Sequence, residues 1–144
     1  MLEKILVPID GSEAAWHALE YACALGEKFD STINIVHVIQ PHYTLPSLAL
    51  HGEIPYVSVN IEEVEITGYQ IIELAKQKMN HYPKVEAFLE FGNPAERILS
   101  LAKVDSYDLI VIGSRGLSGI SEFFLGSIST KVSQYSTIPV MIIK

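Results

Sequence analysis

The most informative part of the chain reads Leu109-Ile110-Val111-Ile112-Gly113-Ser114-Arg115-Gly116 and, after nine further residues, Gly126-Ser127. The apolar run 109–112 predicts a buried strand, and the segment 128–135 predicts a helix. A strand, a glycine-rich loop and a helix start present backbone N–H groups to a phosphate. Glycines permit positive φ and close backbone approach, and the Ser127 hydroxyl adds a donor. One glycine alone would indicate only a tight turn or a helix start, but three at this spacing favour phosphate binding.

Strand and helix patterns alternate outward from this stretch. A continuous apolar run predicts a strand buried on both faces at 5–9, and largely apolar runs predict further strands at 33–39 and 138–143. Apolar residues that alternate with charged ones predict an edge strand at 85–89. Helical spacing of apolar residues predicts helices at 12–29, 64–82 and 93–102. Strand and helix therefore alternate four times before a last strand, which predicts an α/β fold with a parallel sheet and helices on both faces.

Helix starts and strand ends carry their own sequence signals. Pro8 cannot donate to a sheet, so we expect it at the end of the first strand. Asp10 and Glu13 have capping-box spacing, with Asp10 in the cap role. The run Asn93-Pro94-Ala95-Glu96 predicts a helix that Asn93 caps and whose first position is Pro94.

Length and composition indicate one globular domain over residues 1–144. The chain is 49% hydrophobic and 19% charged, which excludes a disordered protein and allows a sizeable core. The net charge is −7 and no basic cluster is present, so we expect no nucleic-acid surface.

The cellular compartment is predicted from the lack of a disulfide, of a signal peptide and of a membrane-spanning run. Cys23 is the single cysteine, so no internal disulfide forms, and its helical context predicts a small buried residue. Residues 1–10 contain an acid and a proline where a signal peptide needs a longer apolar run. The sequence contains no run of about 18 or more apolar residues, so we expect no membrane-spanning helix. We therefore expect a cytoplasmic protein without a membrane partner.

The segment 40–60 and the histidines give no assigned functional site. The segment Gln40–Asn60 contains three prolines and predicts a surface loop, whose apolar residues either form a lid or partner surface or fold back over the core. His37 is expected to be a hydrogen-bonded histidine near a strand end rather than a ligand. The other histidines lack metal-ligand spacing, so no metal site is assigned; they are His17, His42, His51 and His81.

The glycine motif, together with other segments, resembles the universal stress protein family in its ATP-binding branch. The matching segments, besides Gly113-x2-Gly116-x9-Gly126-Ser127, are Lys4–Ser12, Ile35–Ile39 and Ser136–Ile143. The resemblance implies an open five-stranded sheet of order 3-2-1-4-5, Rossmann-like and similar to the adenine nucleotide alpha hydrolases. The first and fourth strands are then neighbours where the winding reverses, which is where such sheets bind ligands.

The resemblance also implies a role for each residue of that cleft. Pro8, Ile9 and Asp10 match positions beside adenine and ribose, and the backbone of Val38 matches one that reads the adenine edge. Ile112 and Gly113 match positions under the ribose and phosphates. The positions that match the triphosphate cradle are Gly116, Gly126, Ser127 and Ile128, while Ser114 and Arg115 fill the variable positions between the first two glycines.

The residues favour binding over catalysis. No Gly-Lys-Ser/Thr tripeptide is present, so this is not a Walker A loop, and we expect backbone amides, Ser127 and a bound Mg²⁺ to hold the phosphates of ATP. Asp10 could position water, but a capping role is about as probable, and Glu122 is expected to be solvated. We therefore predict an ATP-binding regulatory protein with at most slow hydrolysis.

The sequence leaves two alternative functions open and predicts a homodimer. The alternatives are a true ATPase or nucleotidyl transferase on this fold, and a dimeric scaffold with an empty site. The last strand would lie at a sheet edge with few charges, so we expect a homodimer through Val140–Ile143. The competing interpretation is that the 40–60 loop covers this edge within one chain. No other protein partner can be named.

Overall fold

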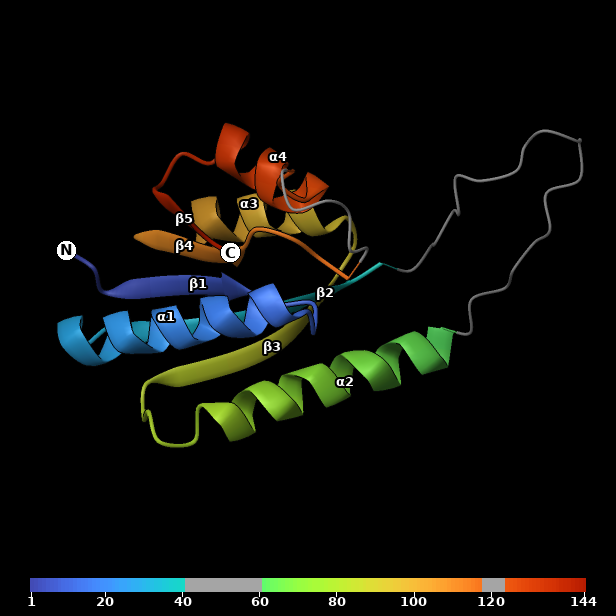
Figure 1. The fold of residues 1–144 in the computed structure, drawn as a ribbon, viewed down its shortest axis with the longest axis horizontal. Helices are drawn as coiled ribbons and strands as arrows, with labels where there is room; N and C mark the ends of the chain where they lie inside the picture. Colours follow the sequence, from blue (N-terminus) through green and yellow to red (C-terminus); the bar gives the residue numbers. More distant parts are fainter. Residues whose placement is uncertain (41–60, 118–123) are drawn as a thin grey trace, which may run out of the picture.

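The computed structural model describes residues 1–40, 61–117 and 124–144, and within them five parallel strands form one sheet (Figure 1). The strands are β1 (Lys4–Pro8), β2 (Thr32–Ile39), β3 (Val85–Phe91), β4 (Leu109–Gly113) and β5 (Val140–Ile143). The helices are α1 (Glu13–Phe29), α2 (Ile61–Lys78), α3 (Pro94–Val104) and α4 (Ser127–Tyr135). The strand order is β3-β2-β1-β4-β5, which confirms the predicted α/β fold, its topology and the edge position of β3.

The central strand β1 pairs on both sides. Lys4–Pro8 pairs with the residues of β2 from Thr32 to Val36, whereas only Ile5 and Leu6 pair with β4. The apolar residues of β1 are fully buried because helices cover both faces of the sheet, as the continuous apolar run predicts.

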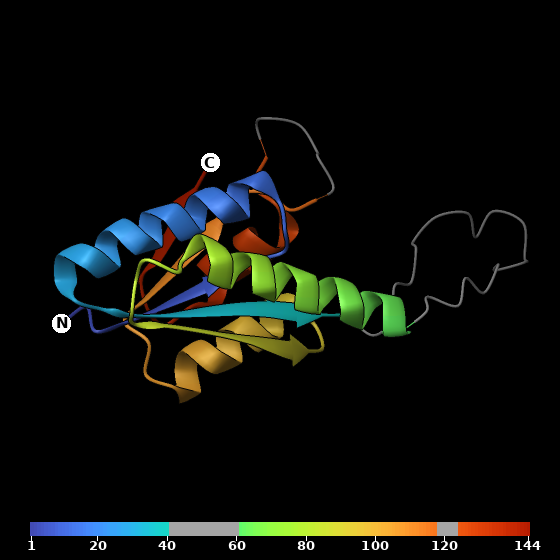
Figure 2. The same ribbon diagram turned by 90° about the horizontal axis from the view of Figure 1, so that it is seen from below.

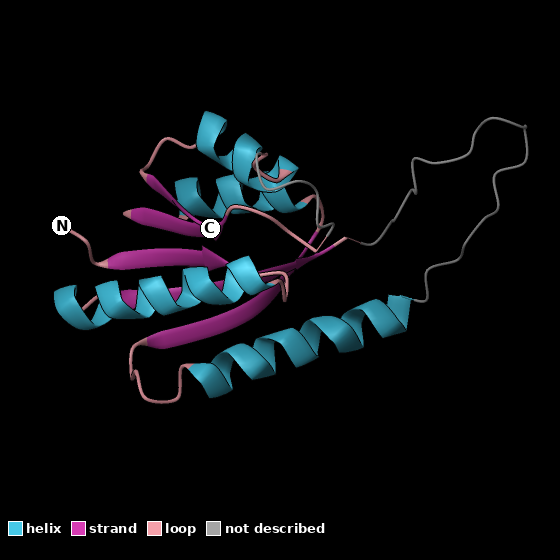
Figure 3. Ribbon diagram, in the orientation of Figure 1, coloured by secondary structure: helices cyan, strands magenta, loops and turns pink. Residues whose placement is uncertain are grey.

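Two helices cover each face. Figures 1 and 2 show α1 and α2 over one face of the sheet and α3 and α4 over the other. Successive residues of β1 point to opposite faces, so Ile5 and Val7 pack in the core under α1 and α2, and Leu6 packs in the core under α3 and α4. Each strand except β5 is followed by a helix, and all the pairings are parallel, so the strands end at the same edge of the sheet (Figure 3).

The helix starts confirm one prediction and correct another. Asn93 caps α3, since its Oδ1 accepts from the N–H of Glu96 at 3.2 Å. The prediction that Asp10 caps α1 is wrong, because Ser12 is the cap and its Oγ accepts from the N–H of Ala15 at 3.2 Å. Gly11, with φ of +85°, turns the chain once more before the helix begins, and Asp10 Oδ1 accepts from the N–H of Ser12 at 2.9 Å to close this turn.

Two boundaries differ from the predicted ones for identifiable reasons. β5 begins at Val140 rather than at residue 138, because Ser136 Oγ donates to the carbonyl of Ile138 at 2.7 Å and holds a local turn before Pro139. α2 ends at Lys78, since the segment up to Tyr82 forms turns instead of a last helical turn. Pro8 ends β1 and Cys23 is buried, as predicted. Of the helices described, none has the length and apolar character required to cross a membrane.

Candidate functional site

A pocket of about 440 Å³ opens where β1 and β4 end. The chain leaves β1 toward α1 on one face and leaves β4 toward α4 on the other, so the neighbouring strands separate at this point. This is the point where the strand order of the sheet reverses, and open α/β sheets bind ligands at such points. The volume of the pocket is typical of a small-molecule site.

The pocket brings together nearly all of the residues that the sequence predicted. These residues are Pro8, Ile9, Asp10, Val38, Ile112, Gly113, Arg115, Gly116, Gly126, Ser127 and Ile128. They come from β1, β2, β4, the loop after β4 and the first turn of α4, which are far apart in the sequence. The predicted residue that the structure does not place in this wall is Ser114.

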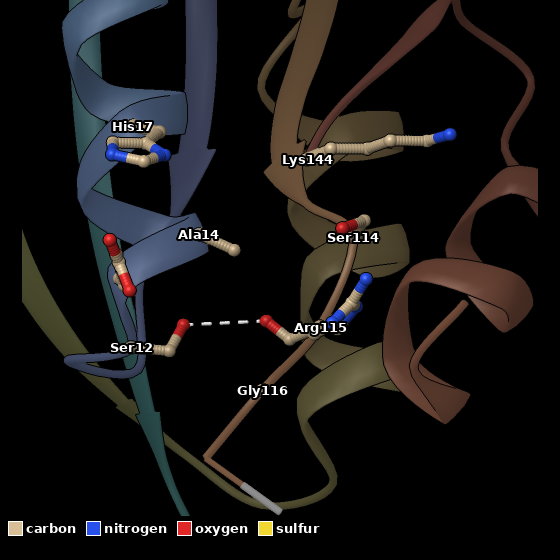
Figure 4. Close-up of a pocket in the computed structure, with 8 residues that line it drawn as sticks. Ser12, Ala14, His17, Ser114, Arg115, Gly116 and Lys144 are labelled. Carbon is tan, nitrogen blue, oxygen red and sulfur yellow. Dashed lines mark hydrogen bonds between the residues drawn. The ribbon is translucent and has the colours of Figure 1, made fainter. Parts of the chain in front are cut away.

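Ser114 points instead into a second, shallower cavity of about 330 Å³ beside the start of α1. Figure 4 shows this cavity with Ala14 and His17 on the wall formed by α1 and with Ser114 and Lys144 on the opposite wall. The Oγ of Ser12 donates to the carbonyl of Arg115 at 3.3 Å across its floor. The loop after β4 therefore separates two cavities.

The first turn of α4 forms one wall of the main pocket. The side chains of Ser12 and Asn93 cap α1 and α3, but Gly126 at the N-cap of α4 provides no side-chain hydrogen bond. The other helices carry an acidic residue in the first turn, and α4 carries none. The first amides of a helix have no partner within it, and the helix dipole makes this end positive. Within the described residues, the start of α4 therefore presents donors and a positive potential that no acidic side chain of its own first turn offsets.

The Ser114 carbonyl fixes the position of this helix end. It accepts from the N–H of Gly126 at 2.6 Å and from the Oγ of Ser129 at 3.1 Å. The N–H of Ser114 donates to the carbonyl of Ile143 at 2.6 Å. Ser114 is only 3% exposed, so this arrangement is held inside the protein. It joins the loop after β4 to both α4 and the end of β5.

Gly113 and Gly126 of the motif lie close to other backbone segments and do not have unusual φ. Among the described glycines, positive φ occurs at Gly11 and Gly92, while Gly126 has φ of −60°, so the ability of glycine to adopt positive φ is not used at position 126. A Cβ at Gly113 would lie 2.7 Å from the carbonyl carbon of Ala14. A Cβ at Gly126 would lie 3.3 Å from the carbonyl oxygen of Ser114.

On the β1 side, Asp10 and His37 hold the backbone in place. Asp10 Oδ1 closes the turn before α1, and a Cβ at Gly116 would lie 2.9 Å from its Oδ2. The Nδ1–H of His37 donates to the carbonyl of Ile9 at 2.8 Å, which agrees with the predicted structural role of this histidine. Asp10 is the one carboxylate, and Arg115 the one permanent cation, among the described residues that line the pocket.

The edge of β2 exposes backbone groups to the pocket. The ladder between β1 and β2 ends at the pair Pro8–Val36, and the N–H of Ile9 donates to the carbonyl of Val36 at 2.8 Å. Backbone groups of residues two apart in a strand point to the same side, so those of Val38 point where β1 has already ended. They face the pocket with no β1 residue opposite them.

Sequence reasoning missed several residues of the wall. These are Ala15, Val36, His37, Pro94, Ile98, Leu117 and Ser129. Val36 and His37 adjoin Val38, and the hydroxyl at Ser129 follows Ser127 by two positions, so the sequence held a weak signal for them. Pro94 and Ile98 line the pocket because α3 packs beside α4, and no local sequence pattern predicts this packing.

Comparison with known proteins agrees with this geometry. The sequence model of the universal stress protein family matches residues 1–144. Universal stress protein YxiE from Bacillus subtilis is 39% identical over 148 residues, and the alignment covers all of both chains. The solved structure of MJ0577, which is a universal stress protein from Methanocaldococcus jannaschii, superimposes with a TM-score of 0.76 at 28% identity and covers 100% of this chain and 96% of that one.

A third comparison concerns a structure with a ligand. A universal stress protein family protein from Arabidopsis thaliana, solved with AMP bound, shares the fold with a TM-score of 0.67 at 22% identity. The superposition covers 99% of this chain and 91% of that one.

Proposed function

This chain belongs to the universal stress protein family, and from that premise we propose that it binds ATP with Mg²⁺ between β1 and β4 and acts as a nucleotide-dependent regulatory protein. The observation that carries the proposal is the uncapped first turn of α4, which faces the pocket. The N-cap side chains of α1 and α3 hydrogen-bond to their own first turns, whereas Gly126 has no side chain that could do so, which supports a role for the first amides of α4 in holding a ligand. An AMP-bound Arabidopsis protein of the same fold supports the choice of an adenine nucleotide.

The phosphates would rest on α4 and on the loop before it. The amides of Ser127 and Ile128 and the hydroxyl of Ser127 supply neutral donors, and Arg115 adds charge. Hydrogen bonds to a charged group are worth about 1.5–3 kcal/mol each, so the loss of one of them is expected to weaken binding by about tenfold or more.

The adenine would occupy the apolar end of the pocket. Ile9, Val38 and Ile98 line this region, and the backbone of Val38 offers one donor and one acceptor. A donor and an acceptor side by side match the edge of adenine, whereas guanine presents a different pattern. We therefore propose that the backbone of Val38 selects adenine.

The residues of the pocket fit Mg²⁺ bound together with ATP. Mg²⁺ usually keeps several waters and takes one or two carboxylates together with phosphate oxygens. Asp10 supplies one carboxylate next to Gly116, where the phosphate loop passes. When bound, the cation would neutralise part of the phosphate charge that Arg115 alone does not balance.

We expect calorimetry to detect ATP binding that strengthens with Mg²⁺ and exceeds the affinity for GTP. The reason is the pairing of the Val38 backbone with adenine and of the α4 amides with phosphate. ATP, AMP and GTP should be titrated into the same preparation after removal of any copurified nucleotide. Equal affinity for GTP would contradict adenine selection, and no binding at millimolar ATP would contradict the proposed function.

We expect ATP turnover far below the ~10 s⁻¹ typical of enzymes. Phosphoryl transfer needs an oriented nucleophile and groups that stabilise the negative charge that develops in the transition state. Asp10, the candidate for orienting water, already holds the turn before α1 through its Oδ1. A phosphate-release assay measures this rate. A rate near ~10 s⁻¹ that an Asp10→Asn variant abolishes would show an ATPase instead.

We further propose a homodimer through β5. This strand pairs with β4 on one side only, and its apolar residues Val140, Met141 and Ile142 remain partly exposed. An unpaired apolar edge recruits a second strand, and a two-fold axis would pair two copies antiparallel. The alternative cover is the segment 40–60, of which residues 41–60 lie outside the described residues.

Sedimentation equilibrium is expected to give twice the monomer mass of 16.0 kDa at micromolar concentration. Val140→Lys together with Ile142→Lys should give a monomer, because the dimer would bury unpaired charges. Val104→Lys, at the exposed end of α3, is the control and should remain dimeric. Circular dichroism must show that the double variant is folded; a folded double variant that stays dimeric would place the interface elsewhere.

A further inference from the structure

Three metal-ligating side chains meet on the face of the sheet under α1 and α2, away from the pocket. Cys23 and Glu27 lie four residues apart on α1, and His81 lies in the turn that follows α2. The Cys23 Sγ is 3.3 Å from the His81 Nε2 and 3.9 Å from the Glu27 Oε1, and the last two atoms are 3.8 Å apart. The sequence separation of 58 residues between Cys23 and His81 explains why no ligand spacing was visible.

These distances are close to those of one face of a tetrahedral zinc site. Zinc lies about 2.3 Å from sulfur and about 2.0 Å from imidazole nitrogen or carboxylate oxygen. At tetrahedral angles, sulfur is then ~3.5 Å from the other donors, and nitrogen is ~3.3 Å from oxygen. Each side of the observed triangle is within about 0.5 Å of these separations, so small rotamer adjustments of Glu27 and His81 would complete the geometry.

The elements that carry the three side chains are held firmly. Cys23 is 7% exposed and belongs to the core under α1 and α2. Tyr82, next to His81, is buried, and its hydroxyl donates to the carbonyl of Ser31, which fixes the turn. The side chains of Glu27 and His81 remain 56% and 55% exposed, so a cation and one water can reach the group from solvent.

We propose that Cys23, Glu27 and His81 bind a divalent cation of the zinc class, with water in the fourth position. A thiolate, an imidazole and a carboxylate form a mixed donor set that suits Zn²⁺ or Co²⁺ and does not suit Mg²⁺ or Ca²⁺, which take oxygen ligands. The cation would link the second half of α1 to the turn between α2 and β3.

A redox role for Cys23 fits the surroundings less well. No neighbouring cysteine exists to form a disulfide, since Cys23 is the only one in the chain.

The site is separate from the proposed nucleotide pocket. The pocket lies at the start of α1, and Glu27 lies fourteen residues beyond Glu13, which corresponds to ~21 Å along a helix. The cation is therefore expected to stabilise the fold without contacting the nucleotide. Its binding can be measured independently of the proposed function.

The test uses the reduced, nucleotide-free, full-length protein with metal alone. Titration with Co²⁺ should produce a thiolate-to-metal charge-transfer band, which can come only from Cys23 because it is the one cysteine. Titration with Zn²⁺ should remove this band by displacement. Zn²⁺ should also raise the unfolding temperature, since the ligand binds the native state.

Variants assign the ligands. Cys23→Ala should abolish the band, and His81→Gln should weaken Zn²⁺ binding by more than about 100-fold, because even residues that only support metal ligands contribute about 10–100-fold. Glu27→Gln should weaken binding as well, whereas the matched controls Glu20→Gln and His17→Gln on α1 should leave it unchanged. Absence of the band in the wild type, or equal Zn²⁺ affinity in folded His81→Gln, would overturn the proposal.

Discussion

Gly113→Ala is expected to lower the free energy of unfolding by about 3 kcal/mol or more, at the upper end for overpacked cores. A Cβ at this position would lie 2.7 Å from the carbonyl carbon of Ala14 and 2.9 Å from both the Ala14 oxygen and the Ala15 nitrogen. All three atoms belong to the backbone of the first turn of α1, so no side chain can rotate away. Either β4 or α1 would have to shift.

Urea unfolding monitored by circular dichroism measures this loss through the midpoint concentration. Gly116→Ala is the matched control, since its Cβ would meet only the Asp10 Oδ2, which is the end of a movable side chain. The control should lose less stability than Gly113→Ala. If Gly113→Ala stays within about 0.5 kcal/mol of the wild type, as a harmless surface substitution does, the close packing of β4 against α1 is not rigid.

Gly126→Val is expected to reduce ATP affinity by at least about 100-fold while the fold persists, because losing two amide–phosphate hydrogen bonds costs about 3 kcal/mol or more. The backbone at residue 126 has φ of −60° and ψ of 154°, which is an allowed extended conformation for valine. The added carbons, however, would enter the narrow space between Ser114 and the first turn of α4. The amides would then shift away from the position that receives phosphate.

Gly126→Asp separates binding from stability at the same position. Its carboxylate would cap α4 and satisfy the first amides, although an aspartate cap stabilises a helix by only a few tenths of a kcal/mol relative to a glycine cap. It would also occupy the phosphate position with negative charge. The small gain from the cap and the close Ser114 carbonyl oppose each other, so the expected outcome is a folded protein of near wild-type stability that binds ATP poorly, measured by urea unfolding and calorimetry on one preparation. Wild-type affinity in both variants would show that α4 does not hold phosphate.

Much of the fold follows from local chemistry that the sequence displays. Apolar runs predicted the buried strands, and Asn93-Pro94 predicted the start of α3, because the forces involved act between residues close in sequence. The strand order came from the family resemblance, and the observed sheet confirms it.

The errors and omissions arise where tertiary contacts decide. Ser12 replaces Asp10 as the cap because Gly11 adds a turn that the spacing of acids does not record. Gly126 is a glycine because the loop at Ser114 passes close to it, which only the packed structure shows. His81 meets Cys23 because α2 returns along the same face as α1, so the cluster has no linear pattern.

The hydrogen bonds of Ser114 have a thermodynamic consequence. Its carbonyl holds the start of α4, and its N–H holds the carbonyl of Ile143 in β5, the strand proposed to pair between two copies. A ligand that shifts the loop around Ser114 therefore acts directly on the dimer strand. By linkage, if ATP strengthens dimerisation by some factor, dimerisation strengthens ATP binding by the same factor. Cellular ATP and protein concentration would then be two inputs to one equilibrium.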